Sequence, residues 1–352
     1  MSSVVMNWYR NIDRTKFQFD FIVFNDGPLR EEIECLGGNI YVLPTLRQSP
    51  INYYLGLQKI FKGRRIYNGI HVHNSFKNGV MLWLAKKAKI NVRVCHSHTS
   101  GVENKWLLPI FYLLRKLVLS ASSVWLACGK NAGDFLYQHR HYYVINNAIT
   151  VERFLFDCEK LAQAKQASEK YHLPKNKKII VHVGRFSQVK NHHFLLALAM
   201  SDKLNEQCHF VCIGDGPLKS AFQGDIRKHD LESRFSLLPA NNDIPALLAC
   251  ADIFVMPSLF EGVSVAMLEA QAASLPCIVS NTIATEADMQ LNLVSFLPLD
   301  EPTLWVDKLN ETIKVALSPE RCLNAFDRLG YSTAAVIKQI TSIYLSKPSH
   351  ET

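Results

Sequence analysis

Short apolar runs alternate with longer amphipathic segments along the whole chain. The clearest runs occupy 178–183, 209–213, 235–238, 253–256 and 277–280. Apolar residues at consecutive positions over so short a length are typical of strands covered on both faces of a parallel sheet. The segments between them have the length and spacing of helices, so the pattern predicts an α/β fold.

The first half of the chain repeats this alternation. Strands are expected at 19–24, 40–43, 70–73, 92–96, 124–128 and 143–145, and helices at 4–12, 29–36, 53–61 and 79–88. The 352 residues exceed one ordinary core, so two doubly wound domains are expected. We place the first domain at 1–155, the second at 156–330, and a terminal helix at 331–352 that packs back toward the first domain.

Composition favours a globular protein. Hydrophobic residues make up 48% and charged residues 20% of the chain, which excludes disorder as the main state. None of the nine cysteines forms a C-x-x-C pair, so they are interpreted as core residues in a reducing, cytoplasmic compartment. Cys208, His209 and Cys212 lack a second ligand pair at zinc-site spacing. No signal-peptide pattern and no apolar stretch of roughly 18 residues is visible, so no membrane span is expected.

The net charge of +8 is unevenly distributed. Residues 1–150 contain 19 lysines and arginines against 8 acidic residues, whereas the remainder has a small negative excess. A basic first half favours an anionic partner, either a phosphate-bearing substrate or a membrane surface. Apolar, aromatic and basic residues at 105–116 predict peripheral contact with the inner face of the membrane, although a core helix with basic ends explains them too. Nucleic acid is disfavoured because the basic residues are scattered without a binding motif.

The stretch 253–276 combines a buried strand, a tight loop and a helix expected to begin near Val263. The free backbone N–H groups at this helix start, which suit an anion, are those of Gly262, Val263 and Ser264. Glu261 and Glu269 flank these donors, and carboxylates accept hydrogen bonds from hydroxyls. A nucleotide-sugar fits, because it has phosphates between two hydroxyl-rich groups. On spacing alone, the glutamates would be surface positions of an ordinary α/β unit.

The two glutamates lie within PSxxEG…EAxAxxxP, which resembles the donor-site signature of retaining GT-B glycosyltransferases of family 4. The resemblance extends over nearly the whole chain. Gly184 and Arg185, together with Lys190, are similar to the family's VGR…K motif, in which glycine permits close approach and the cations neutralise a diphosphate. A solvated pair of loop cations is the alternative.

The turn Gly214-Asp215-Gly216-Pro217 resembles the family's GDGP turn beside the donor nucleotide. Gly214 and Gly216 are therefore expected in the donor site, although a tight turn alone would also need glycine.

The resemblance implies two Rossmann-like domains facing a cleft. Glu269 would accept hydrogen bonds from ribose hydroxyls, and Glu261 would contact the donor sugar. Arg185, Lys190 and the helix N-terminus would stabilise the departing diphosphate, so neither a metal nor another cofactor is expected. The chain has no D-x-D cluster of the kind that chelates a metal-diphosphate.

Histidines in the first half resemble the family's acceptor-side region. His98 is the better candidate for the reaction centre, because alternation places it on one face with His96 but farther out of the sheet. His71 and His73 are weaker candidates, and the segment 73–75 is expected to line the acceptor pocket. A single histidine is by default a satisfied core or loop residue.

The sequence departs from the family at several places. Around Asn147 and at 239–241 it lacks residues that the family usually has, so base recognition is less defined than diphosphate recognition. The family begins with a strand and a Gly-rich loop, whereas Met1 falls directly at the first helix. A central strand would then be missing beneath 4–12, and we expect weak nucleotide binding and poor transfer. An upstream extension with a strand and a Gly-Gly loop should restore both stability and rate.

The expected function is transfer of a sugar, with retention, from a nucleotide-diphosphate sugar to a glycan or lipid-linked acceptor in extracellular or capsular polysaccharide synthesis. UDP is the expected nucleotide. A UDP-sugar 2-epimerase would share the architecture and convert donor without an acceptor. A non-enzymatic scaffold would bind no donor.

Overall fold

The computed structural model describes residues 2–73, 75–98, 108–155, 158–240 and 243–346. The chain divides into unit 1, with residues 1–147 and 333–352, and unit 2, with residues 148–332. The expected boundaries, 155/156 and 330/331, lie eight and two residues away, respectively. A backbone bridge between Ile149 and Ser332 brings the two ends of unit 2 together. Both boundaries between the units therefore lie next to this bridge.

Unit 2 is built on one six-stranded sheet of parallel strands, in the order β12-β11-β10-β7-β8-β9. The strands are β7 (Lys178–Val183), β8 (Cys208–Ile213), β9 (Phe235–Leu238), β10 (Ile253–Met256), β11 (Cys277–Ser280) and β12 (Val294–Leu297). The helices are α7 (Cys158–Lys170), α8 (His192–Ala199), α9 (Lys219–Lys228), α10 (Ile244–Cys250), α11 (Val265–Ala272), α12 (Pro302–Glu311) and α13 (Pro319–Arg328).

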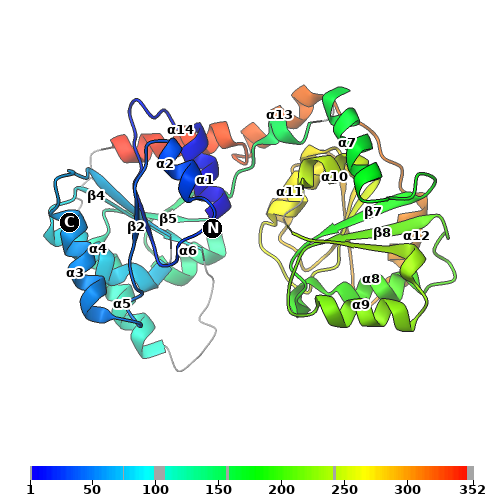
Figure 1. Cartoon of the computed structure of the whole chain (residues 1–352), viewed down its shortest axis with the longest axis horizontal. Helices are drawn as coiled ribbons and strands as arrows, with labels where there is room; N and C mark the ends of the chain where they lie inside the picture. The colour runs from blue at the N-terminus through cyan, green and yellow to red at the C-terminus, as the bar shows by residue number, and fades with distance from the viewer. Residues whose placement is uncertain (1, 74, 99–107, 156–157, 241–242, 347–352) are drawn as a thin grey trace. The chain divides into compact units, whose positions relative to one another are not determined.

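Helices cover both faces of this sheet (Figure 1). Along β10, Phe254 and Met256 join an apolar layer with α10 and α11, whereas Ile253 and Val255 join the opposite layer with α8 and α9. Because side chains alternate between faces along a strand, a strand covered on both sides must be apolar throughout. The continuous apolar runs in the sequence are therefore explained.

The apolar pattern does not predict β12, since only helices are expected after residue 280. All four residues of β12 are partly buried, and Ser295 interrupts its apolar run. It forms beside β11, with Cys277 opposite Val294 and Ser280 opposite Leu297. The open edge of β11 thus determines this strand.

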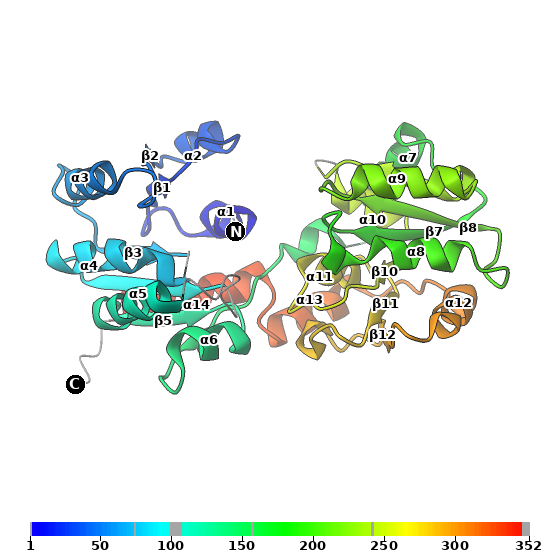
Figure 2. The ribbon, with the colours of Figure 1, turned by 90° about the horizontal axis from the view of Figure 1, so that it is seen from below.

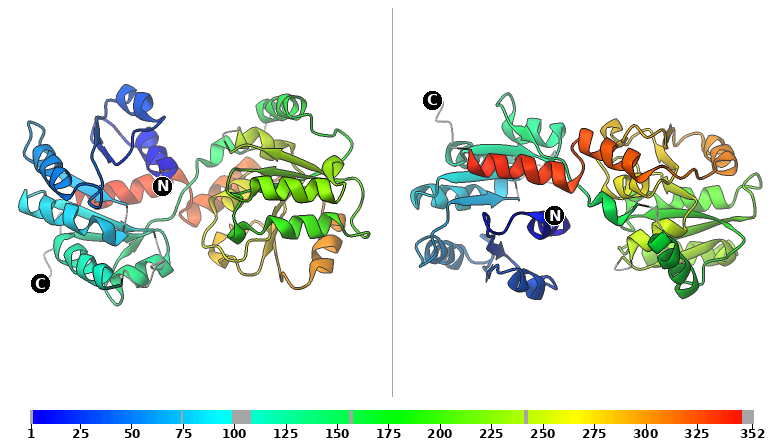
Figure 3. Two further views of the ribbon diagram at one scale, coloured as in Figure 1. Left: turned by 60° about the horizontal axis from the view of Figure 1, so that its bottom comes forward. Right: turned by 90° about the horizontal axis from the view of Figure 1, so that it is seen from above.

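Unit 1 contains two separate parallel sheets, one of β1 and β2 and one in the order β3-β4-β5-β6. The strands are β1 (Phe21–Val23), β2 (Ile40–Val42), β3 (Gly69–Val72), β4 (Val92–Ser97), β5 (Val124–Ala127) and β6 (Tyr143–Val144). The helices are α1 (Ser2–Asn11), α2 (Arg30–Cys35), α3 (Pro50–Phe61), α4 (Gly79–Lys87), α5 (Leu108–Ala121), α6 (Lys130–Tyr137) and α14 (Thr333–Leu345). Figures 2 and 3 show β1 and β2 apart from the four-stranded sheet.

The last helix, α14, returns to unit 1 and packs against α1. The Asn7 side chain donates to Thr333 Oγ1 at 2.7 Å, and the Gln339 amide donates to the Val144 carbonyl at 3.2 Å. Residues from both ends of the chain therefore complete one unit.

The segment expected to contact a membrane is only partly described, because 105–107 lie outside the described residues. In α5, Phe111 and Val118 are buried, whereas Ile110, Tyr112 and Leu113 are 52%, 56% and 63% exposed. One face of α5 is thus core and the other carries exposed apolar side chains. Within the described chain, no helix has both the length and the apolarity that crossing a membrane requires.

Candidate functional site

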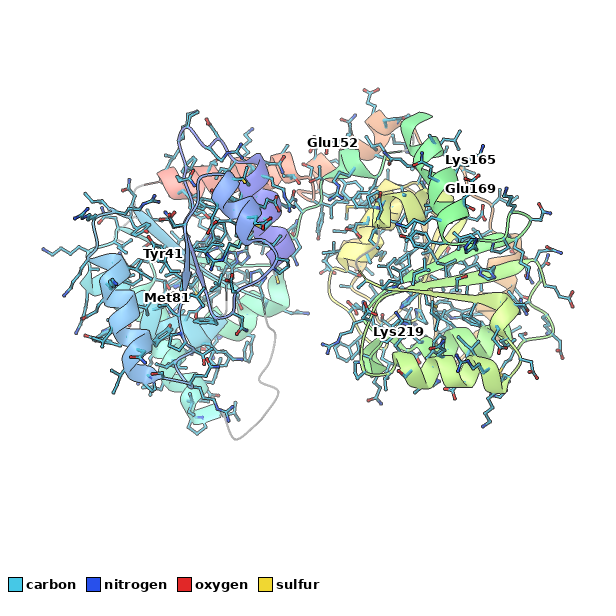
Figure 4. All side chains as sticks on the ribbon, viewed as in Figure 1. Tyr41, Met81, Glu152, Lys165, Glu169 and Lys219 are labelled. Carbon is cyan, nitrogen blue, oxygen red and sulfur yellow. The ribbon has the colours of Figure 1, made fainter. Side chains whose placement is uncertain are left out.

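The loops that follow β7 and β8 interlock at the carboxyl ends of these strands. A Cβ on Gly214 would overlap the carbonyl oxygen of Gly184, and a Cβ on Gly216 would overlap the backbone of Phe186. The Lys219 ammonium, labelled in Figure 4, donates to the Gly214 carbonyl at 2.8 Å and holds the turn closed. Both glycines are therefore required for this close backbone approach.

Two predicted phosphate-binding cations lie in the first of these loops, but they have different surroundings. The Arg185 side chain is exposed, and no described residue forms a hydrogen bond or ion pair with it. Lys190, at the end of the short 3₁₀ turn η4 (Gln188–Lys190), lies 2.7 Å from Glu261 Oε1, and the two side chains are only 16% and 20% exposed. The structure thus brings together two candidates that are distant in sequence.

The loop after β10 is joined to the loop after β7. The Leu259 amide donates to the Val189 carbonyl at 2.8 Å, and the Asn191 side chain donates to the Pro257 carbonyl at 3.1 Å. These two hydrogen bonds hold the loop that carries Glu261 beside the loop that carries Lys190.

Helix α11 begins at Val265, two residues later than expected, because Ser264 is the extended residue that precedes it. Within the described residues, no backbone acceptor is bonded to the amides of Gly262, Val263 or Ser264. A Cβ on Gly262 would meet nothing within 4 Å. These amides therefore form an open, electropositive end of α11.

Glu269 lies on α11 and is largely shielded from solvent. Burial raises its pKa to about 7, and the charge of Arg153 offsets only part of that effect. The described residues offer its carboxylate no hydrogen bond. A partly buried carboxyl without a partner costs free energy, and hydroxyl donors from a ligand would reduce that cost.

The sequence did not lead us to His182, which lies in β7 two residues before Gly184. Its ring nitrogen Nδ1 is 2.9 Å from the Val255 carbonyl, whereas the buried Nε2 has no partner and lies 3.2 Å from the position of a Cβ on Gly184. Burial lowers its pKa to about 4, so the ring is neutral, with Nδ1 as donor and Nε2 as acceptor. The sequence signal that could have identified His182 is its position as a polar residue inside the apolar run 178–183.

In unit 1, His71, His73, His96 and His98 gather at the ends of β3 and β4. His71 Nε2 lies 3.3 Å from His96 Nδ1, and His73 Nδ1 lies 3.1 Å from His98 Nε2. Burial lowers the pKa of His71 to about 3 and that of His98 to about 4, and it also lowers the pKa values of His73 and His96. All four rings are therefore uncharged at neutral pH.

The histidine cluster (His71, His73, His96 and His98) is held from both ends of the chain. Trp8 of α1 stacks on His96 with ring centroids 5.9 Å apart, and the Tyr344 hydroxyl of α14 lies 2.6 Å from His71 Nδ1. Asn74 and Thr99, which adjoin the cluster, lie outside the described residues. The contacts from α1 and α14 could not be expected from local sequence.

One nitrogen from each of His71, His73 and His96 lies within 4.8 Å of the others, a spacing that could hold a metal ion. The rings of His71 and His73 are nearly parallel, however, with centroids 4.2 Å apart and a 16° angle between planes. Histidine binds a metal in the plane of its ring, so two parallel rings do not converge on one ion. Coordination would require at least one ring to turn.

Two α/β units with parallel sheets and alternating helices fit the GT-B fold, and solved structures agree. HepE of Anabaena in complex with UDP matches with a TM-score of 0.75 over 97% of this chain and 94% of HepE, at 16% identity. A glycosyltransferase of Rickettsia africae matches with a TM-score of 0.77 over 99% of this chain and 95% of that one, at 16% identity. The expected GT-B fold is confirmed.

Residues 163–322 match the family model for glycosyl transferases group 1. The putative glycosyltransferase EpsF of Bacillus subtilis is 34% identical over 360 residues, which covers 97% of this chain and 92% of EpsF. The UDP-Gal:alpha-D-GlcNAc-diphosphoundecaprenol alpha-1,3-galactosyltransferase of Escherichia coli is 28% identical over 79% of this chain and 75% of its own length. The chain belongs to the group 1 glycosyltransferases. It is also 22% identical to the capsular polysaccharide biosynthesis glycosyltransferase CapH of Staphylococcus aureus, over 91% of this chain and 88% of CapH.

Proposed function

We propose that this glycosyltransferase moves a sugar from a UDP-sugar to a hydroxyl of a glycan or lipid-linked acceptor, with retention of configuration. The observation that carries the proposal is the Lys190–Glu261 pair in unit 2, on loops that also carry Arg185 and the open amides of 262–264. Relatives support the substrate classes, since HepE is solved with UDP-glucose and the Escherichia coli enzyme is named for UDP-Gal and a diphosphoundecaprenol-linked sugar.

The donor diphosphate would lie between Arg185, Lys190 and the amides of 262–264. Arg185 is available without breaking a contact within the described chain, whereas Lys190 must exchange Glu261 for phosphate oxygens. Glu261 would then be released toward the donor sugar hydroxyls. These groups stabilise the negative charge that develops on the departing UDP, which is how a preorganised site lowers the barrier.

Glu269 would accept hydrogen bonds from the ribose hydroxyls. Donation by two hydroxyls favours the ionised carboxylate, which burial disfavours in the free protein. In unit 1, neutral His98, supported by His73, would contact the reacting sugar through a ring nitrogen that can donate or accept. We propose that the reaction needs no metal, because Arg185, Lys190 and the helix amides already supply positive charge.

The deciding experiment titrates the full chain with UDP-, GDP- and ADP-sugars, followed by transfer assays with the donor that binds. Saturable UDP-sugar binding, acceptor-dependent product of retained configuration and activity in EDTA would support the proposal. Preference for GDP- or ADP-sugars would contradict the donor assignment. Conversion of donor without acceptor would favour the epimerase.

We further propose that α5 contacts an anionic membrane surface. Its exposed Ile110, Tyr112 and Leu113 could enter the interface, while the basic first half of the chain adds electrostatic attraction. Sedimentation with anionic vesicles should then weaken as salt rises, because screening removes about 1 kcal/mol per basic residue near the surface. Equal partition to neutral and anionic vesicles would contradict this surface.

A further inference from the structure

Unit 2 buries a histidine whose second ring nitrogen has no partner. His182 of β7 is 1% exposed, and its Nδ1 lies 2.9 Å from the Val255 carbonyl. A carbonyl oxygen can only accept, so Nδ1 carries the proton and Nε2 is an acceptor. Among the described residues, no group donates to Nε2. An unpaired polar atom at this depth costs free energy, so a donor that reached it would be stabilising.

Neighbouring rings hold His182 in this orientation. The ring of His192 lies against it at nearly a right angle, with centroids 4.7 Å apart. His192 is in turn stacked on Phe186, with centroids 4.0 Å apart. Phe186 belongs to the loop 184–191 that carries Lys190, and His192 is the first residue of the helix that follows it. The Nε2 of His182 is therefore an acceptor in a fixed position beside this loop.

The side chain of Lys190 passes next to this acceptor. Three atoms lie 3.2 Å from the position that a Cβ on Gly184 would take, and they are His182 Nε2, Lys190 Cδ and Lys190 Cε. A side chain at position 184 would separate the lysine from the histidine, whereas glycine leaves the space between them open. The charge of Lys190 also adds to the effect of burial in lowering the pKa of His182, as expected for groups that are close together.

In the free protein, the Lys190 ammonium is turned toward Glu261, with Nζ 2.7 Å from Oε1. Nζ is one bond away from Cε, so rotation about the last bonds of the side chain can turn the ammonium toward His182. An ammonium has three N–H donors, and a diphosphate need not occupy all of them. Ionised phosphate oxygens offer no proton, so Nε2 would not bind the diphosphate itself.

We propose that His182 is a positioning residue of the donor site, whose Nε2 accepts a hydrogen bond from the Lys190 ammonium when a diphosphate draws that lysine away from Glu261. The bond would hold the ammonium between the ring and the phosphate oxygens. The ring stays neutral and exchanges no proton with the lysine. This inference rests on the proposed function, because it takes Lys190 as a ligand of the donor diphosphate.

The first test compares two replacements of His182. The side-chain amide of His182→Gln reaches the position of Nε2, whereas that of His182→Asn reaches only the position of Nδ1 and can still donate to Val255. UDP affinity, measured by calorimetric titration, should fall roughly tenfold in His182→Asn, as for the loss of a hydrogen bond to a charged group. His182→Gln should restore most of it.

His209→Asn is the matched control. His209 is also a buried histidine of unit 2, but its nitrogens lie close to Ser233 and Ser236, at 3.2 and 2.9 Å. Its replacement should lower the melting temperature and leave UDP affinity unchanged. A similar loss of affinity in His209→Asn would mean that UDP affinity follows stability, which would contradict the proposed role of His182.

The second test asks whether the effect of His182 passes through Lys190. In a Lys190→Ala background, His182→Asn should no longer change UDP affinity, because the ammonium that Nε2 would hold is absent. An equal loss in both backgrounds would overturn the proposal, as would a loss in His182→Gln as large as that in His182→Asn.

The third test needs no UDP and separates this inference from the proposed function. In Glu261→Ala, the lysine loses its carboxylate partner and should turn to His182 in the free protein. The nitrogen-15 resonance of His182 Nε2 should then move to lower frequency, and it should stay in place when Lys190 is also replaced by Ala. An unmoved resonance would overturn the inference even if UDP binds. A moved resonance in a chain whose wild type binds no UDP would support the contact and contradict the proposed function.

Discussion

The two units use the same architecture but differ in how completely it is assembled. Unit 2 has six strands in one sheet, apolar layers on both faces, and loops locked to one another by the contacts of Gly184, Gly214 and Val189. Unit 1 divides its strands between two sheets and buries a cluster of neutral histidines. The loops at the strand ends of unit 2 are held by contacts with one another, whereas the histidine cluster is held by long-range packing of α1 and α14.

Replacing Gly214 by Ala should have the largest effect on stability and UDP affinity, because it disrupts the close contact between the loops after β7 and β8. The added Cβ would overlap the Gly184 carbonyl, so the free energy of unfolding should fall by about 2–4 kcal/mol. UDP affinity should fall at least a hundredfold, measured by titration calorimetry beside denaturant unfolding.

Gly224→Ala is the matched control, since a Cβ there meets nothing within 4 Å on helix α9. It should be neutral or stabilising by about 0.5–1 kcal/mol. If Gly214→Ala kept native stability and UDP affinity, the loops after β7 and β8 would not be rigidly held by their contact.

Arg185→Ala and Lys190→Ala test whether the edge of unit 2 serves a ligand more than the fold. Arg185→Ala should keep the melting temperature while UDP-sugar affinity falls roughly ten- to a hundredfold, because a charge-assisted contact contributes about 1.5–3 kcal/mol. Lys190→Ala should lose affinity similarly, and it also breaks the pair with Glu261. The control variant Lys228→Ala, at an exposed position, should bind the UDP-sugar with wild-type affinity. Unchanged affinity in both Arg185→Ala and Lys190→Ala would contradict the assignment of these residues to the donor site.

Glu269→Gln should make unit 2 more stable at high pH. The pKa of Glu269 is about 7 in the folded protein against an ordinary 4.5, so the folded state keeps the proton longer. The wild type therefore loses stability as pH rises from about 4.5 to 7, and the variant should exceed it by about 1–3 kcal/mol at pH 8 but match it near pH 4. Denaturant unfolding at both pH values measures this, with exposed Glu206→Gln as control.

The same carboxylate predicts that UDP affinity of the wild type weakens as pH falls below 7, because hydroxyl donors favour the ionised form. Calorimetric titrations with UDP at several pH values between about 5.5 and 8 would measure this dependence. A flat wild-type profile would mean that Glu269 is buried for packing alone.

Tyr344→Phe should give the smallest effect, confined to unit 1. It removes the hydroxyl bonded to His71 Nδ1, which should cost about 1 kcal/mol of unfolding free energy. Exposed Tyr112→Phe should change nothing. Weaker UDP binding in Tyr344→Phe would contradict the proposal that unit 2 binds the nucleotide.

The sequence by itself determined most of the fold. The expected strands 178–183, 235–238, 253–256 and 277–280 have the bounds of β7, β9, β10 and β11, since a strand buried on both faces must be apolar at every position. The ends of the expected strands 178–183 and 209–213 also pointed to Gly184, Arg185 and Gly214 as site candidates, because strand ends and glycine turns are local features. The strand β12 was not predicted, because Ser295 interrupts its apolar run and the strand forms only by pairing with β11.

Tertiary structure alone decided which distant residues meet. Lys190 contacts Glu261, and His71 contacts Tyr344 across 273 positions; no local pattern encodes either contact, because each arises only when separate strands and helices pack. Burial, which raises the pKa of Glu269 and lowers that of His98, is likewise a property of the assembled unit. The division of unit 1 into two sheets also exists only in three dimensions, where strand order replaces chain order.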